Sequence, residues 1–269
     1  EGIIDKYHQV LLSGPPGTSK SYLARKLSES YDSSTKIQFH PQYTYQQFVG
    51  GYVVEEDKVV FRKGVLLNLL DEVKKDESKK HLLIIDEINR ANVSQVLGEV
   101  VQCLDRDNDV SIFDGEKRVL INLPKNLHIF ATMNSSDRTI GSLDHAVRRR
   151  FLNVYCAPDR DILMKLCTSE NFISLSDFME KINSRLNENL NNRELKIGHA
   201  FFLSEDVKEE DEKYHWTFDS FEILFNYRIL PMIEEFCYGD PTKILSILGE
   251  NLSKRLEGKE FENALKNYL

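Results

Sequence analysis

The sequence has few cysteines, no long apolar run and no recognisable leader segment. Its four cysteines, Cys103, Cys156, Cys167 and Cys237, stand at wide and irregular spacings without a Cys-x-x-Cys pair, which argues against a disulfide framework or a zinc site. No apolar run approaches the roughly 18 residues of a membrane-spanning helix, so we expect no membrane partner. Residues 1–6 lack the basic and then apolar pattern of a secretory signal. These absences predict a cytoplasmic protein.

The charge of the chain is unevenly distributed. The 269 residues are 41% hydrophobic and 29% charged, which is typical of a globular protein with one large or two modest domains. Residues 1–155 contain 21 basic and 21 acidic side chains, whereas residues 156–269 contain 14 basic and 22 acidic ones, so the net charge of −8 lies in the second segment. Because an acidic surface repels phosphate, we expect no DNA-binding surface within residues 156–269.

Short apolar runs alternate with helical patterns in the first half of the chain, which is typical of a parallel sheet covered by helices. Five strands are expected, at residues 9–13, 36–40, 81–85, 127–132 and 151–155. Two hairpins are expected, one pairing residues 52–54 with 59–61 and the other pairing 110–113 with 119–121. After Pro158 the pattern is helical only, most clearly at 221–237 and 241–255. We therefore expect an α/β large subdomain at residues 1–157, with a parallel sheet flanked by helices, and an all-helical lid at 158–269.

A glycine-containing loop follows the first expected strand and precedes a helical pattern that begins at Tyr22. The loop consists of Gly14, Pro15, Pro16, Gly17, Thr18, Ser19, Lys20 and Ser21. In such a loop the backbone N–H groups point at nucleotide phosphates, the lysine neutralises them and the last hydroxyl ligates Mg²⁺. Ser19 stands where glycine is usual, in a conformation that serine tolerates less well. A chance turn before a helix is the alternative, and the strand–loop–helix context disfavours it.

Two acids, Asp86 and Glu87, end the apolar run at residues 82–85. Since open parallel sheets bind ligands outside the carboxyl ends of their strands, we expect both acids to face the phosphates. Asp86 would hold Mg²⁺, and Glu87 would accept a proton from the attacking water. Asn134, just after the strand at 127–132, would orient that water. Taken alone, the acid pair is more often a helix cap, and Asn134 fits a turn residue as well as it fits a catalytic one, so these roles depend on the loop.

Three arginines, Arg148, Arg149 and Arg150, end a short helix that is expected to begin near Ser142. Cations at a helix C-terminus interact favourably with the helix dipole, which is one explanation for the cluster. However, three adjacent arginines do not all face their own chain's phosphates. In ring assemblies such a cluster reaches the γ-phosphate of the neighbouring subunit. We favour this second explanation, with Arg149 and Arg150 as catalytic candidates.

With these residues in place, the sequence resembles an AAA+ P-loop NTPase, and more narrowly the McrB family of GTP-hydrolysing motors in modification-dependent restriction systems. The segments that carry the narrow resemblance lie at residues 39–49, 86–92, 133–138, 143–151, 197–202 and 234–241. The most specific of them are Met-Asn-Ser-Ser-Asp-Arg at 133–138 and Ile-Gly-His-Ala-Phe-Phe at 197–202.

The resemblance implies GTP as substrate, Mg²⁺ as cofactor, a hexameric ring of identical subunits, a partner nuclease of McrC type, and DNA engaged through the ring or through a domain N-terminal to this segment. It also implies that Asp137 and Arg138 take part in nucleotide binding. ATP stays open as the substrate, because Asn134-Ser135-Ser136-Asp137 has serine where the guanine-reading Asn-Lys-x-Asp motif has lysine. The alternatives are an ATP-dependent remodelling chaperone of the MoxR or dynein-like branch and, because of Ser19, a scaffold that does not hydrolyse nucleotide.

Overall fold

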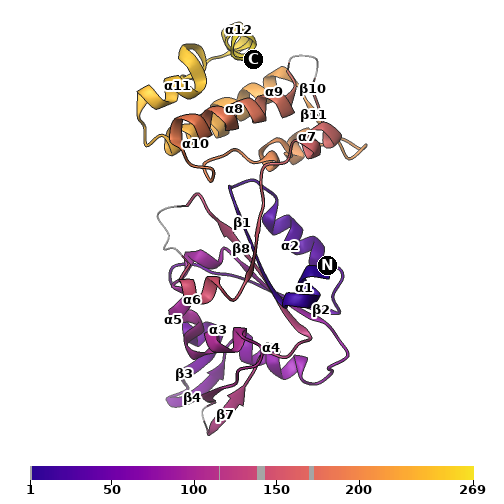
Figure 1. Ribbon diagram of the computed structural model, residues 1–269, viewed down its shortest axis with the longest axis vertical. Helices are drawn as coiled ribbons and strands as arrows, with labels where there is room; N and C mark the ends of the chain where they lie inside the picture. The colour runs from indigo at the N-terminus through magenta and orange to yellow at the C-terminus, as the bar shows by residue number, and fades with distance from the viewer. Residues whose placement is uncertain (1, 115, 138–142, 170–172) are drawn as a thin grey trace. The chain divides into compact units, whose positions relative to one another are not determined.

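The computed structural model describes residues 2–114, 116–137, 143–169 and 173–269, and the chain divides into two compact units (Figure 1). The first unit consists of residues 1–13 and 20–155, and the second of residues 14–19 and 156–269. Each unit has its own hydrophobic core. The loop at 14–19 thus belongs to the second unit although it lies near the start of the chain, an assignment that no feature of the sequence indicates.

The first unit is built on a five-stranded sheet with the order β2-β5-β8-β1-β9. Its strands are β1 (Gln9–Gly14), β2 (Ser33–Gln38), β5 (His81–Asp86), β8 (Leu127–Asn134) and β9 (Leu152–Tyr155). The pairs β2–β5, β5–β8 and β1–β9 are parallel. Every residue of β1 and β5 is buried, which explains their continuous apolar sequences. The predicted parallel sheet is therefore confirmed.

Strand β2 begins three residues before the predicted start at Lys36. It lies at the edge of the sheet, and its residues alternate between half-buried and exposed. An edge strand of this kind needs no apolar run, so Ser33, Ser34 and Thr35 carried no hydrophobic signal.

Short helices complete the first unit. They are α1 (Gly2–Tyr7), α2 (Lys20–Ser28), α3 (Tyr45–Phe48), α4 (Val65–Val73), α5 (Val93–Leu97) and α6 (His145–Arg148), with 3-10 turns at Ile88–Arg90 and Gly98–Leu104. Helix α2 contacts β5 and β8, and Figure 1 shows it beside the sheet. Helix α6 begins after Asp144, whose carboxylate accepts a hydrogen bond from the Ala146 N–H. Ser142, where this helix was expected to begin, lies outside the described residues.

Both predicted hairpins are present. They are formed by β3 (Gly50–Glu55) with β4 (Lys58–Lys63), and by β6 (Val110–Phe113) with β7 (Arg118–Ile121). In the first hairpin, Glu56 and Asp57 both have positive φ, as a two-residue turn between twisted strands requires. Figure 1 shows the hairpins at the same end of the unit, and the rings of Tyr52 and Phe113 lie 6.4 Å apart.

The second unit is mainly helical, as predicted. Its helices are α7 (Arg160–Leu166), α8 (Leu175–Leu190), α9 (Phe218–Leu224), α10 (Leu230–Phe236), α11 (Pro241–Leu252) and α12 (Gly258–Tyr268). A π-helical turn at Phe225–Ile229 joins α9 to α10, so the helix expected at 221–237 is continuous. The structure adds two short parallel strands, β10 (Cys167–Ser169) and β11 (Tyr214–Trp216). Three residues are too few to produce a recognisable strand pattern, which is why these strands were not predicted.

Candidate nucleotide-binding site

The carboxyl ends of the neighbouring strands β5 and β8 bring several polar side chains to one edge of the sheet. Asp86 is the last residue of β5 and Asn134 is the last residue of β8. The register pairs Ile85 with Ala131, so Thr132 lies beside Asp86. The Thr132 hydroxyl donates a hydrogen bond to the Asp86 carboxylate and accepts one from the Glu87 backbone N–H at 3.2 Å. Thr132 therefore fixes both acids relative to β8.

Asp86 is 8% exposed and is surrounded by groups that stabilise its charge. In addition to the Thr132 contact, its carboxylate accepts a hydrogen bond from the Ser21 hydroxyl at 2.9 Å and lies 3.3 Å from the Lys36 ammonium. Burial alone would raise the pKa of Asp86, but the hydrogen bonds from Thr132 and Ser21, together with Lys36, hold it below its ordinary value. The carboxylate is thus kept ionised near neutral pH.

The pairing of Ser21 with Asp86 suits a magnesium ion. Mg²⁺ prefers oxygen ligands and is usually held by one or two carboxylates together with hydroxyl, phosphate and water oxygens. Ser21 and Asp86 supply one hydroxyl and one carboxylate 2.9 Å apart at the start of α2 and the end of β5. Within the residues that the structure describes, no group of three or more His, Cys, Asp or Glu side chains forms a metal cage. The donor set therefore fits an ion completed by phosphate and water.

Glu87 follows Asp86 with a left-handed backbone, at φ 52° and ψ 48°. Its carboxylate accepts a hydrogen bond from the Gln38 side-chain amide at 3.1 Å and forms an ion pair with Arg90 at 2.7 Å. Arg90 also lies 3.8 Å from the carboxylate of Asp137. One arginine therefore links the candidate base Glu87 to the loop after β8.

The loop after β8 contains the remaining candidates of the first unit. The Asn134 backbone carbonyl accepts a hydrogen bond from the side-chain amide of buried Asn89 at 3.4 Å. Asp137 is close to Arg90, as described above. Arg138, predicted to take part in nucleotide binding, lies outside the described residues.

In the second unit, residues 14–19 pack tightly against the turn that contains Gly198. The Ala200 N–H donates a hydrogen bond to the Gly17 carbonyl at 2.8 Å. A Cβ atom on Gly198 would lie 2.1 Å from the Gly17 carbonyl carbon, so no side chain fits there. The Thr18 hydroxyl donates to the Pro15 carbonyl at 2.9 Å. The predicted phosphate loop is thus held by backbone contacts with this turn and by the Thr18 side chain, and a side chain at position 198 would collide with it.

Ser19 also contacts this turn, through its side chain. Its hydroxyl oxygen lies 2.9 Å from Nε2 of His199, and Nδ1 of the same ring accepts a hydrogen bond from the Asp159 N–H at 3.1 Å. His199 is 3% exposed, and burial lowers the pKa of its imidazole. His199 was noted in the sequence as part of a family-like segment, but its contact with Ser19 was not predicted.

The structure distinguishes between the two arginine candidates. The Arg150 side chain is 9% exposed, and its guanidinium binds the Asp105 carboxylate through Nε at 2.8 Å and Nη2 at 2.6 Å. It also donates to the Ala146 carbonyl at 2.9 Å. Arg148 and Arg149 are exposed. Arg150 therefore binds an acid of its own chain, whereas Arg149 is exposed.

Four residues near the acids were not predicted as site residues: Lys36, Gln38, Arg90 and Thr132. Lys36 and Gln38 lie on the edge strand β2, and Thr132 lies in the apolar run of β8. The places of these three residues follow from the register of β5 with β2 and β8, whereas Arg90 ends the 3-10 turn after β5. Polar residues on the two strands that pair with β5 are therefore the sequence signal for Lys36, Gln38 and Thr132.

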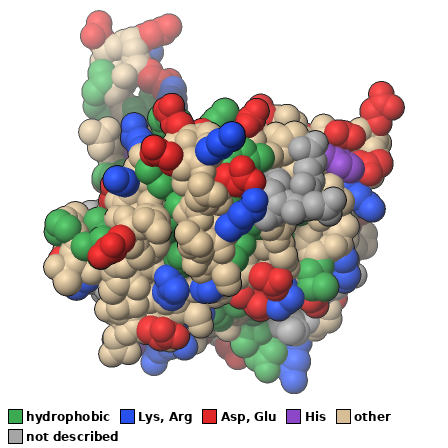
Figure 2. All heavy atoms as spheres, turned by 90° about the horizontal axis from the view of Figure 1, so that it is seen from above, with side chains coloured by type: hydrophobic (Ala, Val, Ile, Leu, Met, Phe, Trp, Pro, Cys, Tyr) green, Lys and Arg blue, Asp and Glu red, His purple; other side chains and the backbone are tan. Residues whose placement is uncertain are grey.

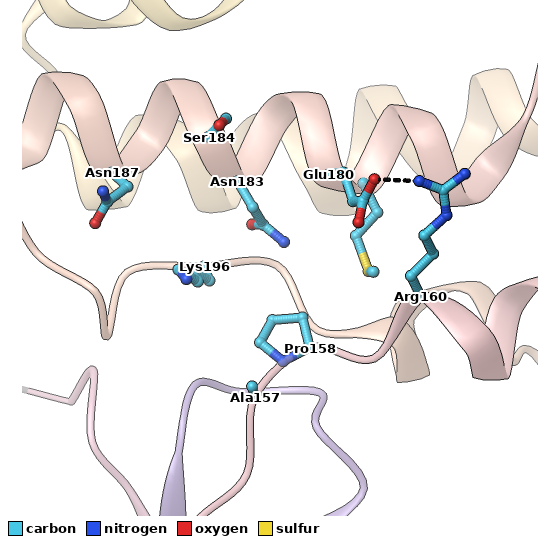
Figure 3. A pocket seen from close by; sticks show the side chains of 9 residues that line it. Ala157, Pro158, Arg160, Glu180, Asn183, Ser184, Asn187 and Lys196 are labelled. Atoms are coloured by element: carbon cyan, nitrogen blue, oxygen red, sulfur yellow. Dashed lines mark hydrogen bonds and ion pairs between the residues drawn. The ribbon is translucent and has the colours of Figure 1, made fainter.

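A separate cavity of about 420 Å³ lies within the second unit, between α8 and the segments that contain Pro158 and Lys196 (Figure 3). Its polar lining is partly engaged already. The Arg160 guanidinium binds Glu180 at 2.6 Å, and the Asn183 side chain exchanges two hydrogen bonds with the backbone of Ile197. Figure 3 shows Asn183 pointing from α8 toward the segment of Lys196. In this wall, Asn183 binds the segment that leads into the turn of Gly198, against which residues 14–19 pack.

Comparison with known proteins agrees with this geometry. Residues 9–151 match the AAA domain of the dynein-related subfamily, and residues 174–245 match the alpha-helical lid domain of McrB. The Type IV methyl-directed restriction enzyme EcoKMcrB subunit of Escherichia coli (strain K12) is 31% identical over 261 residues, which cover 87% of this chain and 55% of that protein. The Type II restriction enzyme BsuMI component YdiS of Bacillus subtilis (strain 168) is 28% identical over 249 residues, which cover 72% of each protein.

The sheet, the loop and the acid pair define a P-loop NTPase of AAA+ architecture. The chain belongs to the dynein-related subfamily of AAA domains and, because its second unit matches the McrB lid, it is of McrB type. The predicted resemblance is thus confirmed. The chain spans about half the length of the E. coli relative, with 55% of that protein covered. In the described parts of the chain, no helix has the length and apolar character needed to cross a membrane.

Proposed function

We propose that this chain is the nucleotide-hydrolysing motor of a McrB-type restriction system, with GTP as the favoured substrate. The observation that carries the proposal is the contact of Ser21 with Asp86, beside Glu87, at the carboxyl edge of a parallel sheet in a chain that also matches the McrB lid. The preference for GTP over ATP comes from the resemblance to the McrB family. An ATP-dependent remodelling chaperone is not favoured, because the lid match is to McrB.

Each residue has a distinct part in the proposed hydrolysis. The backbone N–H groups of residues 14–19 and the Lys20 ammonium bind the phosphates. Ser21 and Asp86 hold Mg²⁺, which when bound neutralises charge on the phosphate oxygens. Glu87 accepts the proton of the attacking water, and Asn134 orients that water. Since Gln38 and Arg90 already bind the Glu87 carboxylate, the base is held in place before substrate arrives.

We also propose that the chain acts as a ring of identical subunits, six by resemblance to the McrB family. A γ-phosphate bound by one chain needs additional positive charge in the transition state. Arg149 is exposed and supplies that charge to the neighbouring subunit, whereas Arg150 is bound to Asp105 in its own chain. Arg149 is thus the proposed trans arginine.

A McrC-like nuclease, DNA and a cytoplasmic location complete the proposal. The two relatives described above are, by name, components of restriction enzymes, and the chain itself has no recognised nuclease motif. Figure 2 shows Lys and Arg side chains interspersed with Asp and Glu side chains on the face that it presents, without a continuous basic area among the described residues visible there. The resemblance to the McrB family supports DNA contact through a ring opening or through a further domain.

Nucleotide hydrolysis by the purified chain tests the proposal. GTP should be hydrolysed faster than ATP in the presence of Mg²⁺, and turnover per subunit should rise with protein concentration as subunits meet. Equal mixtures of Arg149→Ala and Lys20→Ala chains should recover part of the activity that each lacks alone. Arg150→Ala is the matched control. Loss of its ion pair with Asp105 should lower the free energy of unfolding, and mixing it with Lys20→Ala should give no recovery of activity. Tenfold tighter binding of ATP than of GTP would contradict the GTP assignment.

A further inference from the structure

Ser19 combines a strained backbone with a specific side-chain contact. Its φ of 59° lies in the left-handed region, which glycine adopts freely and which is unfavourable for a residue with a Cβ atom. Its hydroxyl oxygen lies 2.9 Å from Nε2 of His199, and both residues belong to the second unit. Ser19, directly before Lys20, therefore has both a strained backbone and a hydrogen bond to His199 that can offset the strain.

The hydrogen bonds of His199 determine which ring nitrogen carries the proton. Nδ1 accepts a hydrogen bond from the Asp159 backbone N–H at 3.1 Å. A neutral imidazole that accepts at Nδ1 carries its proton on Nε2, so His199 donates to Ser19 Oγ. Because Ser19 Oγ accepts this bond, the Ser19 hydroxyl keeps its own proton for another acceptor.

The turn that presents His199 is itself held in place. The Asn183 side-chain amide donates to the Ile197 carbonyl at 2.9 Å, and its oxygen accepts from the Ile197 N–H at 2.7 Å. Figure 3 shows this asparagine directed from α8 toward the segment that leads into the turn. Gly198 then lies against Gly17 with no space for a side chain. His199 therefore reaches Ser19 from a fixed support.

We propose that His199 is a positioning residue for phosphate binding. Through Ser19 Oγ it holds the loop in the conformation that glycine would adopt unaided, and it leaves the Ser19 hydroxyl to donate to a phosphate oxygen of the bound nucleotide. Serine at this position therefore depends on the histidine. This inference rests on the proposed nucleotide binding, since it assigns a role within the same site.

Affinity for fluorescent GTP and ATP analogues, measured on the full chain, tests this dependence. Ser19→Ala keeps the strain and loses the contact, so its affinity should fall roughly tenfold, and His199→Ala should show a similar fall. Ser19→Gly should stay within about threefold of the parent chain, because glycine relieves the strain. In the Ser19→Gly background, His199→Ala should have little further effect. His199→Gln should recover part of the affinity, since its amide N–H replaces the Nε2 donor.

Two further measurements are needed. One shows whether each variant folds, and the other tests the contact between His199 and Ser19 without nucleotide. The unfolding midpoint followed by fluorescence of Trp216, which is buried in the second unit, reports whether each variant folds. A long-range ¹H–¹⁵N spectrum of His199 in the nucleotide-free chain should show the proton on Nε2, and a proton on Nδ1 would overturn the proposed contact.

The outcomes separate the two proposals. If the parent chain binds neither GTP nor ATP, the proposed function fails, while the spectrum still decides whether His199 donates to Ser19. If the parent chain binds nucleotide and His199→Ala costs the same affinity with serine as with glycine at position 19, the histidine does not act through Ser19, and the inference is wrong.

Discussion

Acid should destabilise the first unit through His128, a buried imidazole near the start of β8. The residue is 3% exposed, its Nδ1 lies 2.7 Å from the Tyr31 hydroxyl, and its ring centroid lies 5.4 Å from that of His8. Burial, and then the neighbouring His8, lowers the pKa of His128 from 6.5 to about 4. The folded protein therefore favours the neutral imidazole.

The sign and size of the effect follow from proton linkage. A histidine whose pKa is lower in the folded state contributes stability that is fully present above about pH 6.5 and is lost as the pH falls toward 4, because the unfolded chain binds the proton more readily. With a folded pKa of about 4 against 6.5, linkage gives a loss of about 2 kcal/mol between about pH 7 and about pH 5. Burial also lowers the pKa of His8, so the second histidine adds to the loss.

Urea unfolding at the two pH values measures this loss. Far-UV circular dichroism follows the whole chain, and fluorescence of the single tryptophan, Trp216, follows the second unit separately. His128→Asn keeps a hydrogen-bond acceptor for Tyr31 and removes the titration, so the acid-induced loss should shrink by about 2 kcal/mol. His145→Asn, at an exposed position on α6, is the matched control. An acid-induced loss that stays the same in His128→Asn would refute the reasoning.

Two further predictions concern the site. Lys20→Ala should lose nucleotide binding in calorimetry, whereas Glu87→Gln should bind nucleotide and release phosphate on the order of 10²-fold more slowly; parental turnover in Glu87→Gln would mean that another group is the base. Gly198→Ala should weaken nucleotide binding, because its Cβ would lie 2.1 Å from the Gly17 carbonyl carbon, while Gly2→Ala, whose Cβ would meet nothing within 4 Å, should bind as the parent does.

The strands of the fold were predictable from the sequence where both faces of the strand are buried. Strands β1 and β5 are buried at every position, so their apolar runs marked them to within a residue. Strand β2 is exposed at alternate positions, so the sequence did not mark where it begins. Strands β10 and β11 have three residues each, and their presence depends on pairing with each other in the folded chain. Hydrophobic pattern thus located the core strands and missed the strands that the core does not require.

The motif residues of the candidate site were predictable from the sequence, whereas the residues that contact and hold them were not. The acids at the end of β5 follow from the rule that parallel sheets bind ligands at their carboxyl edge. The contacts of Thr132 and Lys36 with Asp86 depend on strand register, which the sequence does not state. Arg149 and Arg150 are chemically identical in the sequence, and only the fold places Asp105 against one of them.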